Sequence, residues 1–358
     1  MTLNAIAAAR LVNQYIACEG HPRPEDVVAW FGAVQAQEYE PAKWGLGLRM
    51  HAGTRNADVE RAFERGAILR THVMRPTWHF VTARDIRWLL ELTGPRVQRS
   101  LSQYSRRLEL DARTLARALR VVERALGGRQ YLTRLELAER LQRANITATG
   151  QRLATIVMQA ELEGVICSGP RKGKQFTYAL IAERAPRAVR LSRDEALGEL
   201  SLRYFRSHGP ATVRDFVWWS GLTSADARRG LEINRATQQD AGGRAYWSVD
   251  AASSGSMREQ LVHLLPIYDE YLIAYRDRDV VPHGPSVIPA ARTPITFQHA
   301  LVVAGQVAGT WRTARTPRAL LVNATPLRSL KPRERRALAE TVDRYQRFQD
   351  VPVDFSVS

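Results

Sequence analysis

The sequence has only two cysteines and four lysines, and it contains no long apolar run. Cys18 and Cys167 are too few and too far apart for a disulfide framework or a cysteine-based zinc site. No stretch approaches the ~18 consecutive apolar residues of a membrane-spanning helix. Asn4 and Arg10 interrupt the apolar run that an N-terminal signal peptide would need. We therefore expect a soluble, cytoplasmic protein.

The scarcity of lysine contrasts with an excess of arginine. The chain carries 52 Lys and Arg residues against 36 Asp and Glu residues, which gives a net charge of +16. The planar guanidinium group binds phosphate through two parallel hydrogen bonds, so this excess predicts a polyanionic partner such as DNA. A G+C-rich genome would also raise the arginine content everywhere, and composition alone does not separate the two explanations.

The arginines are concentrated in two segments. Residues 96–129 contain nine arginines and have a local charge of +6, and residues 312–347 contain nine arginines and one lysine and have a local charge of +7. A single basic helix face usually means only solvent exposure. Two basic segments in one chain predict the walls of a surface that binds duplex DNA.

Helix-capping patterns predict a helix-turn-helix near residue 220. Thr212 and Thr223 each precede an aspartate by three positions, which is typical of the first turn of a helix. Gly221 lies between the two predicted helices, and the second helix, at 224–233, would be the recognition helix. This helix would expose two arginines, Arg228 and Arg229.

A second module follows the same pattern earlier in the chain. Thr133 would cap one helix, and a second helix at 151–163 would end at Gly164. The next segment, "VICSGPRKGKQFTYAL", consists of two short β-prone runs around a Gly/Pro/Lys loop and predicts a hairpin. A helix-turn-helix followed by a hairpin is a winged helix. The loop carries the basic residues Arg171, Lys172 and Lys174, which suit phosphate contact or belong to a solvated hairpin tip.

Residues 1–95 fit a third copy of this module. Predicted helices at about 3–18, 24–34 and 57–65 precede "ILRTHVMRPTWHFV", which predicts two strands around Arg75-Pro76. Thr82 would then cap another helix that ends at Gly94-Pro95. Three copies of one module with little mutual sequence similarity are the architecture that we predict for residues 1–255.

Beyond residue 256 the pattern changes to alternating β segments. We predict a hairpin that turns at Gly305-Gln306, a strand in "ALLVNATPL", a helix at about 332–349 and a final strand in "VPVDFSV". The predicted fold class is therefore α+β, with three tandem winged-helix modules and a small C-terminal β-rich domain. The predicted divisions are 1–95, 96–130 (a basic helical connection), 131–190, 191–255 and 256–358.

Four motifs in this order resemble a known family. They are "VQAQ", "RTHVMRPTWHFV", "LLPIYDEYLIAYRDR" and "GTWR", and together they resemble the tandem winged-helix DNA glycosylases of the AlkZ and YcaQ type. The resemblance implies three winged helices and a C-terminal barrel-like domain around a C-shaped DNA-binding groove. It also implies excision of alkylated purines, including interstrand crosslinks made by antibiotics, and some members act as self-resistance factors.

The family's catalytic signature falls on Gln35-Ala36-Gln37, and its glutamine form resembles the AlkZ branch. The resemblance implies that Gln35 and Gln37 are catalytic. If the chain becomes extended near Val34, both amides face the same side, and Tyr39 could add a hydroxyl on that face. Two alternatives remain: a solvated helix end, or catalysis by one of the rival carboxylates Glu38 and Glu40.

Further candidate contacts lie outside this motif. Arg75 and Thr77 could contact the DNA backbone, and His79 could contact the lesion, a phosphate or a catalytic glutamine, or be buried and bonded to the backbone. The segment with Tyr268 and Asp269 resembles the family without a role that we can derive, and structural support is the safer interpretation. The loop 276–292 could probe a DNA groove or be a mobile surface loop.

We expect a monomeric, monofunctional hydrolase that acts on double-stranded DNA with alkylated purines or crosslinks and uses neither metal nor cofactor. Lys43 is the lysine near the motif that could form a Schiff base if the enzyme were instead a lyase. A winged-helix transcription regulator is the alternative from another functional class. A protein that shields damaged DNA without catalysis is a third possibility.

Overall fold

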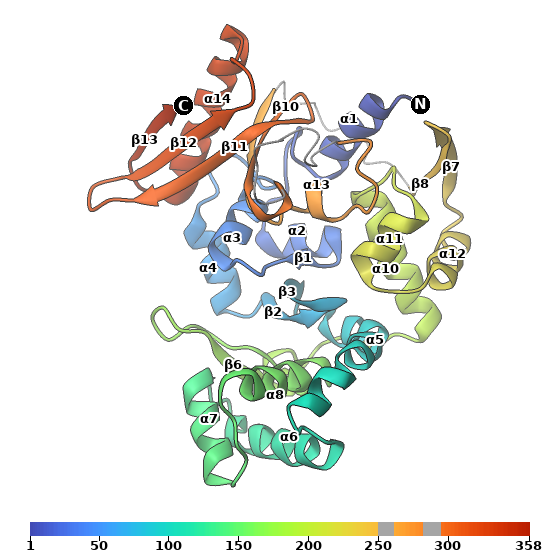
Figure 1. The fold of residues 1–358 in the computed structure, drawn as a ribbon, viewed down its shortest axis with the longest axis vertical. Coiled ribbons are helices and arrows are strands. Elements are labelled where there is room, and N and C mark those ends of the chain that lie inside the picture. Colours follow the sequence, from blue (N-terminus) through green and yellow to red (C-terminus); the bar gives the residue numbers. More distant parts are fainter. Residues whose placement is uncertain (250–260, 282–294) are drawn as a thin grey trace. The chain divides into compact units, whose positions relative to one another are not determined.

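The structure, a computed structural model, describes residues 1–249, 261–281 and 295–358 (Figure 1). The chain forms two compact units. The larger unit comprises Met1–Glu60, Gly198–Trp219 and Thr223–Ser358, and the smaller unit comprises Arg61–Leu197 and Ser220–Leu222. Each unit mixes helices and strands, which confirms the predicted α+β class. The number of winged-helix modules and the five predicted divisions stay predictions.

The larger unit begins with short helices and ends with a sheet. Its helices and strands outside the sheet are α1 (Leu3–Asn13), α2 (Pro24–Phe31), β1 (Val34–Gln35), α3 (Tyr39–Gly47), α4 (Asn56–Glu64, which continues into the smaller unit), α10 (Arg193–Ser207, which begins in the smaller unit), α11 (Val213–Ser220), α12 (Ser224–Ile233), β7 (Thr237–Ala241), β8 (Arg244–Ser248), α13 (Glu270–Ile273) and the 3-10 turn η1 (Ile295–Phe297). Within the described residues, no helix is both long enough and apolar enough to cross a lipid bilayer.

The C-terminal sheet has five strands in the order β13-β12-β11-β10-β9. These strands and the helix α14 are β9 (Val262–Leu265), β10 (His299–Val303), β11 (Gln306–Arg315), β12 (Leu320–Pro326), α14 (Pro332–Gln349) and β13 (Val353–Val357). Only the β12–β13 pair is parallel among these pairs. Thr341 of α14 donates its hydroxyl to the Val262 carbonyl at 2.8 Å and joins the helix to the sheet.

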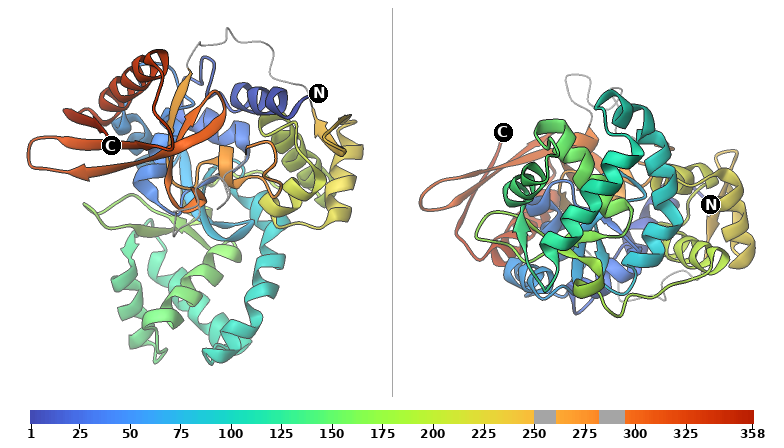
Figure 2. Two further views of the ribbon diagram at one scale, coloured as in Figure 1. Left: turned by 45° about the horizontal axis from the view of Figure 1, so that its top comes forward. Right: turned by 90° about the horizontal axis from the view of Figure 1, so that it is seen from below.

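The predicted strands and helix of this C-terminal region are confirmed, with one shift. The hairpin turns at Ala304-Gly305 instead of Gly305-Gln306, since both residues have positive φ (49° and 79°) and Gln306 already belongs to β11. Figure 2 shows the β11–β12 hairpin as a long arm. Residues 312–315 at its end are exposed on both faces of the strand, which places part of the basic segment 312–347 in solvent.

Aromatic side chains hold α3 against α14. Trp44 is 1% exposed and packs edge-on against Tyr345 and at 5.2 Å from Phe348, both on α14. Trp311 of β11 packs at 5.3 Å from the same Tyr345 ring. Loss of a buried tryptophan costs about 3–5 kcal/mol in comparable cores. The helix that follows the Gln-x-Gln motif is therefore firmly anchored to the C-terminal part of the larger unit.

The predicted helix-turn-helix near residue 220 is present as α11 and α12, and α12 has the predicted bounds 224–233. Thr212 and Thr223 each accept from the backbone N–H of the aspartate three residues later, at 3.1 and 3.0 Å. The predicted module at 191–255 implied a hairpin after α12, and β7–β8 lies there, but the strands themselves were not predicted from the sequence. Its turn residues Gly242 and Gly243 both have positive φ, and this glycine pair is the signal that identifies the turn in the sequence.

The smaller unit is built from two hairpins and a group of helices (Figure 1). Its elements are β2 (Ile68–Val73), β3 (Arg75–Thr82), α5 (Ile86–Arg107), α6 (Ala112–Leu126), β4 (Leu132–Thr133), α7 (Arg134–Arg143), α8 (Gly150–Leu162), β5 (Ile166–Ser168), β6 (Thr177–Leu180) and α9 (Ile181–Arg184). The predicted capping box at Thr133 is confirmed. The predicted helix that stops at Gly164 and the hairpin after it are also confirmed, as α8 and β5–β6.

The prediction that a helix ends at Gly94-Pro95 is wrong. Helix α5 continues through both residues to Arg107. A side chain at Gly94 would place its Cβ 3.0 Å from the Leu162 carbonyl oxygen. This glycine therefore permits close approach of α5 to the end of α8 and does not stop the helix. Proline inside a helix removes one backbone hydrogen bond, and the packing of α5 tolerates this loss.

Three other boundaries also differ from the predictions. The first helix ends at Asn13 instead of residue 18, because Tyr15 adopts a left-handed conformation (φ 56°) and the Ile16 N–H bonds back to Leu11. The second ends at Phe31 instead of residue 34. The β2–β3 hairpin turns at Met74 (φ 63°), so Arg75-Pro76 lies in β3 and not in the turn.

Candidate functional site

The Gln-x-Gln motif lies between helices α2 and α3 of the larger unit. Helix α2 ends because Gly32 adopts a φ of 85°, a conformation that favours glycine. The chain is then extended at β1, which confirms the expected change of conformation near Val34. Gln35 is 9% exposed, Ala36 is fully buried and Gln37 is half-buried. The motif thus leads from a buried to a partly accessible position in two residues.

The main chain of Gln35 is fixed by a distant carboxylate. The Gln35 backbone N–H donates to Glu270 Oε1 at 2.7 Å. Glu270 is 1% exposed and is the first residue of α13. A hydrogen bond from a backbone amide to a buried carboxylate is stronger than a neutral one. This contact sets where β1, and with it the motif, lies in the larger unit.

The second oxygen of Glu270 faces two ring nitrogens. Trp219 Nε1–H donates to Glu270 Oε2 at 3.0 Å, and His208 Nε2 lies 3.4 Å from the same oxygen. Burial lowers the pKa of the fully buried His208 ring, which stacks on Tyr204 with ring centroids 4.6 Å apart. Both oxygens of the carboxylate are therefore engaged by groups from three separate parts of the sequence.

The neighbouring residue, Asp269, forms a buried ion pair. Its carboxylate accepts two hydrogen bonds from Arg49, at 2.8 and 2.7 Å, and both side chains are at most 2% exposed. Arg49 also donates to Gln14 and to the Gly45 carbonyl. Asp269 caps α13 as well, through the Tyr271 N–H. The "IYDEY" segment therefore has a structural role, in which Glu270 contacts the motif and Asp269 contacts Arg49 and α13.

Tyr39 and Lys43 share one carboxylate on α4. The Tyr39 hydroxyl donates to Glu60 Oε2 at 3.1 Å, and Lys43 Nζ donates to the same oxygen at 2.8 Å. Lys43 also lies 2.9 Å from Glu40 Oε2 and is 4% exposed. The ammonium group of Lys43 is thus engaged with two carboxylates, and Tyr39 is 7% exposed.

Two partly exposed aromatic rings, those of Tyr268 and Phe297, pack against each other. Tyr268 has a left-handed backbone (φ 60°), and its ring meets Phe297 edge-on at 5.7 Å. Phe297 is 52% exposed. Burial, and then the negative charge of Glu38, raise the pKa of the Tyr268 hydroxyl. Non-glycine residues with positive φ are often found at functional sites.

The candidates on β3 belong to the smaller unit. His79 is fully buried, and its Nδ1 lies 2.9 Å from the Thr77 carbonyl, which is the geometry of the buried, backbone-bonded alternative. Arg75 and Thr77 are half-buried on the same face of the strand. Contacts of these residues with DNA stay predictions.

Of the basic candidates on the predicted wing and recognition helix, Arg171 is half-buried and the others are exposed. Lys172 pairs with Glu136 at 2.8 Å and holds the pKa of that carboxyl at about 2. Lys174 is exposed, and the Arg171 guanidinium lies 5.2 Å from the Phe176 ring. The expected exposure of the two arginines on α12, Arg228 and Arg229, is confirmed. Part of the predicted loop 276–292, residues 282–292, lies outside the described residues.

Sequence reasoning missed several residues that shape this site. Glu270 lies 235 residues after Gln35, and no local pattern links the two. The same is true of Glu60, which holds Tyr39 and Lys43, and of His208 and Trp219 around Glu270. The only available signal was that "YDEYL" carries adjacent acids in an otherwise apolar segment.

Comparisons with known proteins agree with this architecture. The sequence profile of a family described as DNA glycosylase AlkZ-like matches residues 7–348. An interstrand DNA cross-link repair glycosylase from Streptomyces sahachiroi is 26% identical over 322 residues, which are 86% of each chain. The structure of the Streptomyces sahachiroi DNA glycosylase AlkZ superposes with a TM-score of 0.80 at 23% identity and covers 99% of this chain and 100% of that one. The chain therefore belongs to the AlkZ-like family of DNA glycosylases.

Proposed function

We propose that this DNA glycosylase hydrolyses the N-glycosidic bond of N7-alkylated purines in double-stranded DNA, including bulky adducts and interstrand crosslinks. The proposed biological role is DNA repair or self-resistance to a DNA-alkylating antibiotic. The observation that carries the chemistry is a Gln-x-Gln motif whose backbone is fixed by a buried carboxylate while Gln37 stays partly accessible. The relative named for cross-link repair supports the choice of lesion.

The leaving group determines what the protein must supply. A purine alkylated at N7 is already cationic, so when the C1′–N9 bond breaks, its electron pair moves to the base and the base leaves neutral. No acid is needed for this step. The sugar becomes oxocarbenium-like, as in other glycoside hydrolyses. A water oxygen then bonds to C1′ and loses a proton to solvent.

Neutral amides can meet these remaining demands. A carboxamide oxygen accepts a hydrogen bond from water and presents a negative dipole to a cation. Such positioning and preorganised electrostatics account for several kcal/mol of barrier lowering in enzymes. In this role Gln35 and Gln37 hold the water below C1′ and stabilise the oxocarbenium-like sugar. The fixed backbone of Gln35 provides the rigidity that preorganisation requires.

Bulky adducts are favoured by the surroundings of the motif. The Tyr268–Phe297 pair presents partly exposed aromatic surface, which packs well against flat ring systems. The Lys43 ammonium group is engaged by Glu60 and Glu40. This arrangement supports a monofunctional hydrolase over a Schiff-base lyase, and borohydride should trap no protein–DNA adduct.

The test replaces each glutamine by alanine. On a duplex with one N7-methylguanine, Gln35→Ala and Gln37→Ala should each slow base release under single-turnover conditions by about a hundredfold, because each removes a group that acts in the transition state. Fluorescence anisotropy should show DNA affinity within a few-fold of the unmodified enzyme.

A matched control is Gln142→Ala, the same chemical change at an exposed position of α7. It should change neither release nor affinity. Unaltered release rates in both motif variants would remove Gln35 and Gln37 from the mechanism. Loss of DNA affinity together with release would assign them to binding instead.

A further inference from the structure

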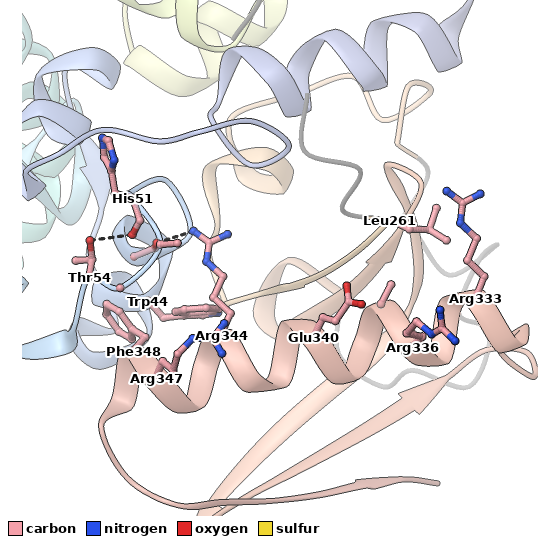
Figure 3. A pocket seen from close by; sticks show the side chains of 14 residues that line it. Trp44, His51, Thr54, Leu261, Arg333, Arg336, Glu340, Arg344, Arg347 and Phe348 are labelled. Atoms are coloured by element: carbon pink, nitrogen blue, oxygen red, sulfur yellow. Dashed lines mark hydrogen bonds between the residues drawn. The ribbon is translucent and has the colours of Figure 1, made fainter. Parts of the chain in front are cut away.

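A basic cavity of about 540 Å³ lies beside α14, at the end of α3 that is opposite the Gln-x-Gln motif. Figure 3 shows arginine side chains that project from one side of the helix into it. We name it the α14 pocket. The side chains that line it include Trp44, Arg333, Arg336, Glu340, Arg344, Arg347 and Phe348.

The charged residues of the α14 pocket form one stripe along the helix. They occupy positions 333, 336, 340, 344 and 347, and steps of three and four residues keep side chains on one face. At 1.5 Å per residue the stripe is about 21 Å long. Four arginines and one glutamate give it a charge of +3. The arginines form two pairs, with Glu340 between them.

Arg344 has a structural role at the back of the pocket. Its guanidinium donates to the carbonyls of Gly47, Leu48 and Met50 at 3.0, 2.8 and 3.2 Å. These bonds hold α14 against the last residue of α3 and the residues that follow it. By contrast, Arg333, Arg336 and Arg347 are exposed at the rim. The pocket therefore has one arginine that is bonded to the protein backbone and three arginines that are accessible to a ligand.

We infer that the α14 pocket binds the sugar–phosphate backbone of duplex DNA outside the lesion, an inference that rests on the proposed function only in taking DNA as the substrate. The two arginine pairs are separated by about 16 Å along the helix axis. One phosphate group cannot reach both pairs. A DNA strand presents a phosphate about every 3.4 Å along its axis, so neighbouring phosphates of one backbone can contact both.

The position of the α14 pocket gives this contact a consequence for the active site. Helix α3 begins at Tyr39, two residues after Gln37, and ends at Gly47, which lines the pocket. The helix is therefore a rigid spacer of about 12 Å between the motif and the anion site. Backbone phosphates held at the α14 pocket would therefore fix the distance between the flanking DNA and the reacting nucleotide at the motif.

The experiment measures binding of undamaged duplex DNA as a function of salt concentration. The double variant Arg336→Gln/Arg347→Gln should lower the slope of log affinity against log salt by about two, because each phosphate contact contributes about 0.9. Glu340→Gln should bind more tightly at every salt concentration, because it removes the negative charge between the pairs. Undamaged DNA keeps this test independent of base release, so failure of the proposed chemistry would not affect it.

The matched control is Arg335→Gln, which removes one charge from the same helix about 100° away from the stripe. Arg335 donates to the Leu330 carbonyl instead of lining the pocket, and its variant should keep the slope. An unchanged slope in the double variant would overturn the inference, as would an equal effect per charge in Arg335→Gln. Calorimetry then measures the binding of inorganic phosphate and of dAMP to the unmodified protein and to the double variant. If the double substitution weakens the binding of these small phosphates but not of DNA, the pocket is a small-phosphate site and the DNA assignment is wrong.

Discussion

Glu270 is the side chain on which the position of Gln35 depends most directly. Glu270→Gln keeps the size of the side chain but replaces one acceptor oxygen by an NH₂ group. That group must then face either the Gln35 N–H or the Trp219 Nε1–H, both of which are donors. An unsatisfied buried donor costs about 1–3 kcal/mol. We expect single-turnover base release to fall at least tenfold, with little change in DNA affinity, in a release assay paired with anisotropy.

Asp269→Asn is the matched control for this prediction. It alters the adjacent buried carboxylate, which contacts Arg49 and not the motif. Breaking a buried ion pair costs about 3–5 kcal/mol, so this variant should lose more thermal stability than Glu270→Gln. At a temperature where both variants are folded, Asp269→Asn should nevertheless release the base faster than Glu270→Gln. Equal release rates would reduce Glu270 to a merely structural residue.

Individual candidate residues were predictable only where a short motif carries them. Gln35 and Gln37 stand out through "VQAQ" and its resemblance to the family, and the exposure of Arg228 and Arg229 follows from the period of one helix. Glu270 could not be predicted, since its role arises from a contact across 235 residues. A histidine such as His79 remains ambiguous in the sequence because burial decides its role.

His299 is the first residue of β10, and it connects this strand to the segment that supports the motif. Its Nδ1 accepts from the Ile267 N–H at 3.1 Å, and its ring packs on Trp311 at 4.7 Å. Burial lowers the pKa of this ring to about 4. In the unfolded chain it binds a proton below about pH 6.5, whereas the folded chain does so only near pH 4. Stability should therefore fall as the pH drops from 6.5 towards 4.

At pH 5 this group should cost about 2 kcal/mol of unfolding free energy relative to pH 7.5. Urea unfolding at the two pH values measures the difference. His299→Asn keeps an acceptor oxygen but cannot titrate, so it should lose most of this acid sensitivity. His51→Asn is the control, because His51 is 46% exposed and pairs with Glu19 at the surface. An acid sensitivity that persists in His299→Asn would assign the effect to other groups.

Helices with a capping signal were predicted well, whereas the short helix α3, which has none, was missed. Thr133, Thr212 and Thr223 identify the starts of α7, α11 and α12 because the hydrogen bonds are local. Helix α3 was missed because its start, Glu38, makes no side-chain cap and its sequence contains Pro41 and two glycines. Gly94 was misinterpreted as a stop because its role, close packing against α8, depends on a distant element.

The division of the chain into compact units could not be predicted from linear patterns. The larger unit joins residues 1–60 to segments beyond residue 198, so its core forms from contacts of long sequence separation. The net charge of +16 was predictive of a DNA-binding protein. The position of this charge in the fold was harder to predict. The basic segment 312–347 separates into the end of the β11–β12 hairpin and the stripe on α14.

The central claim is that a cationic leaving group removes the need for an acid, so that two amides suffice. The most direct measurement compares release of N7-methylguanine with release of hypoxanthine, a neutral base, from otherwise identical duplexes between pH 6 and pH 9. Since neither glutamine titrates in this range, we predict a flat pH profile for the cationic base and no detectable release of the neutral one. Comparable release of hypoxanthine, or a bell-shaped profile for N7-methylguanine, would reveal a general acid and contradict the account.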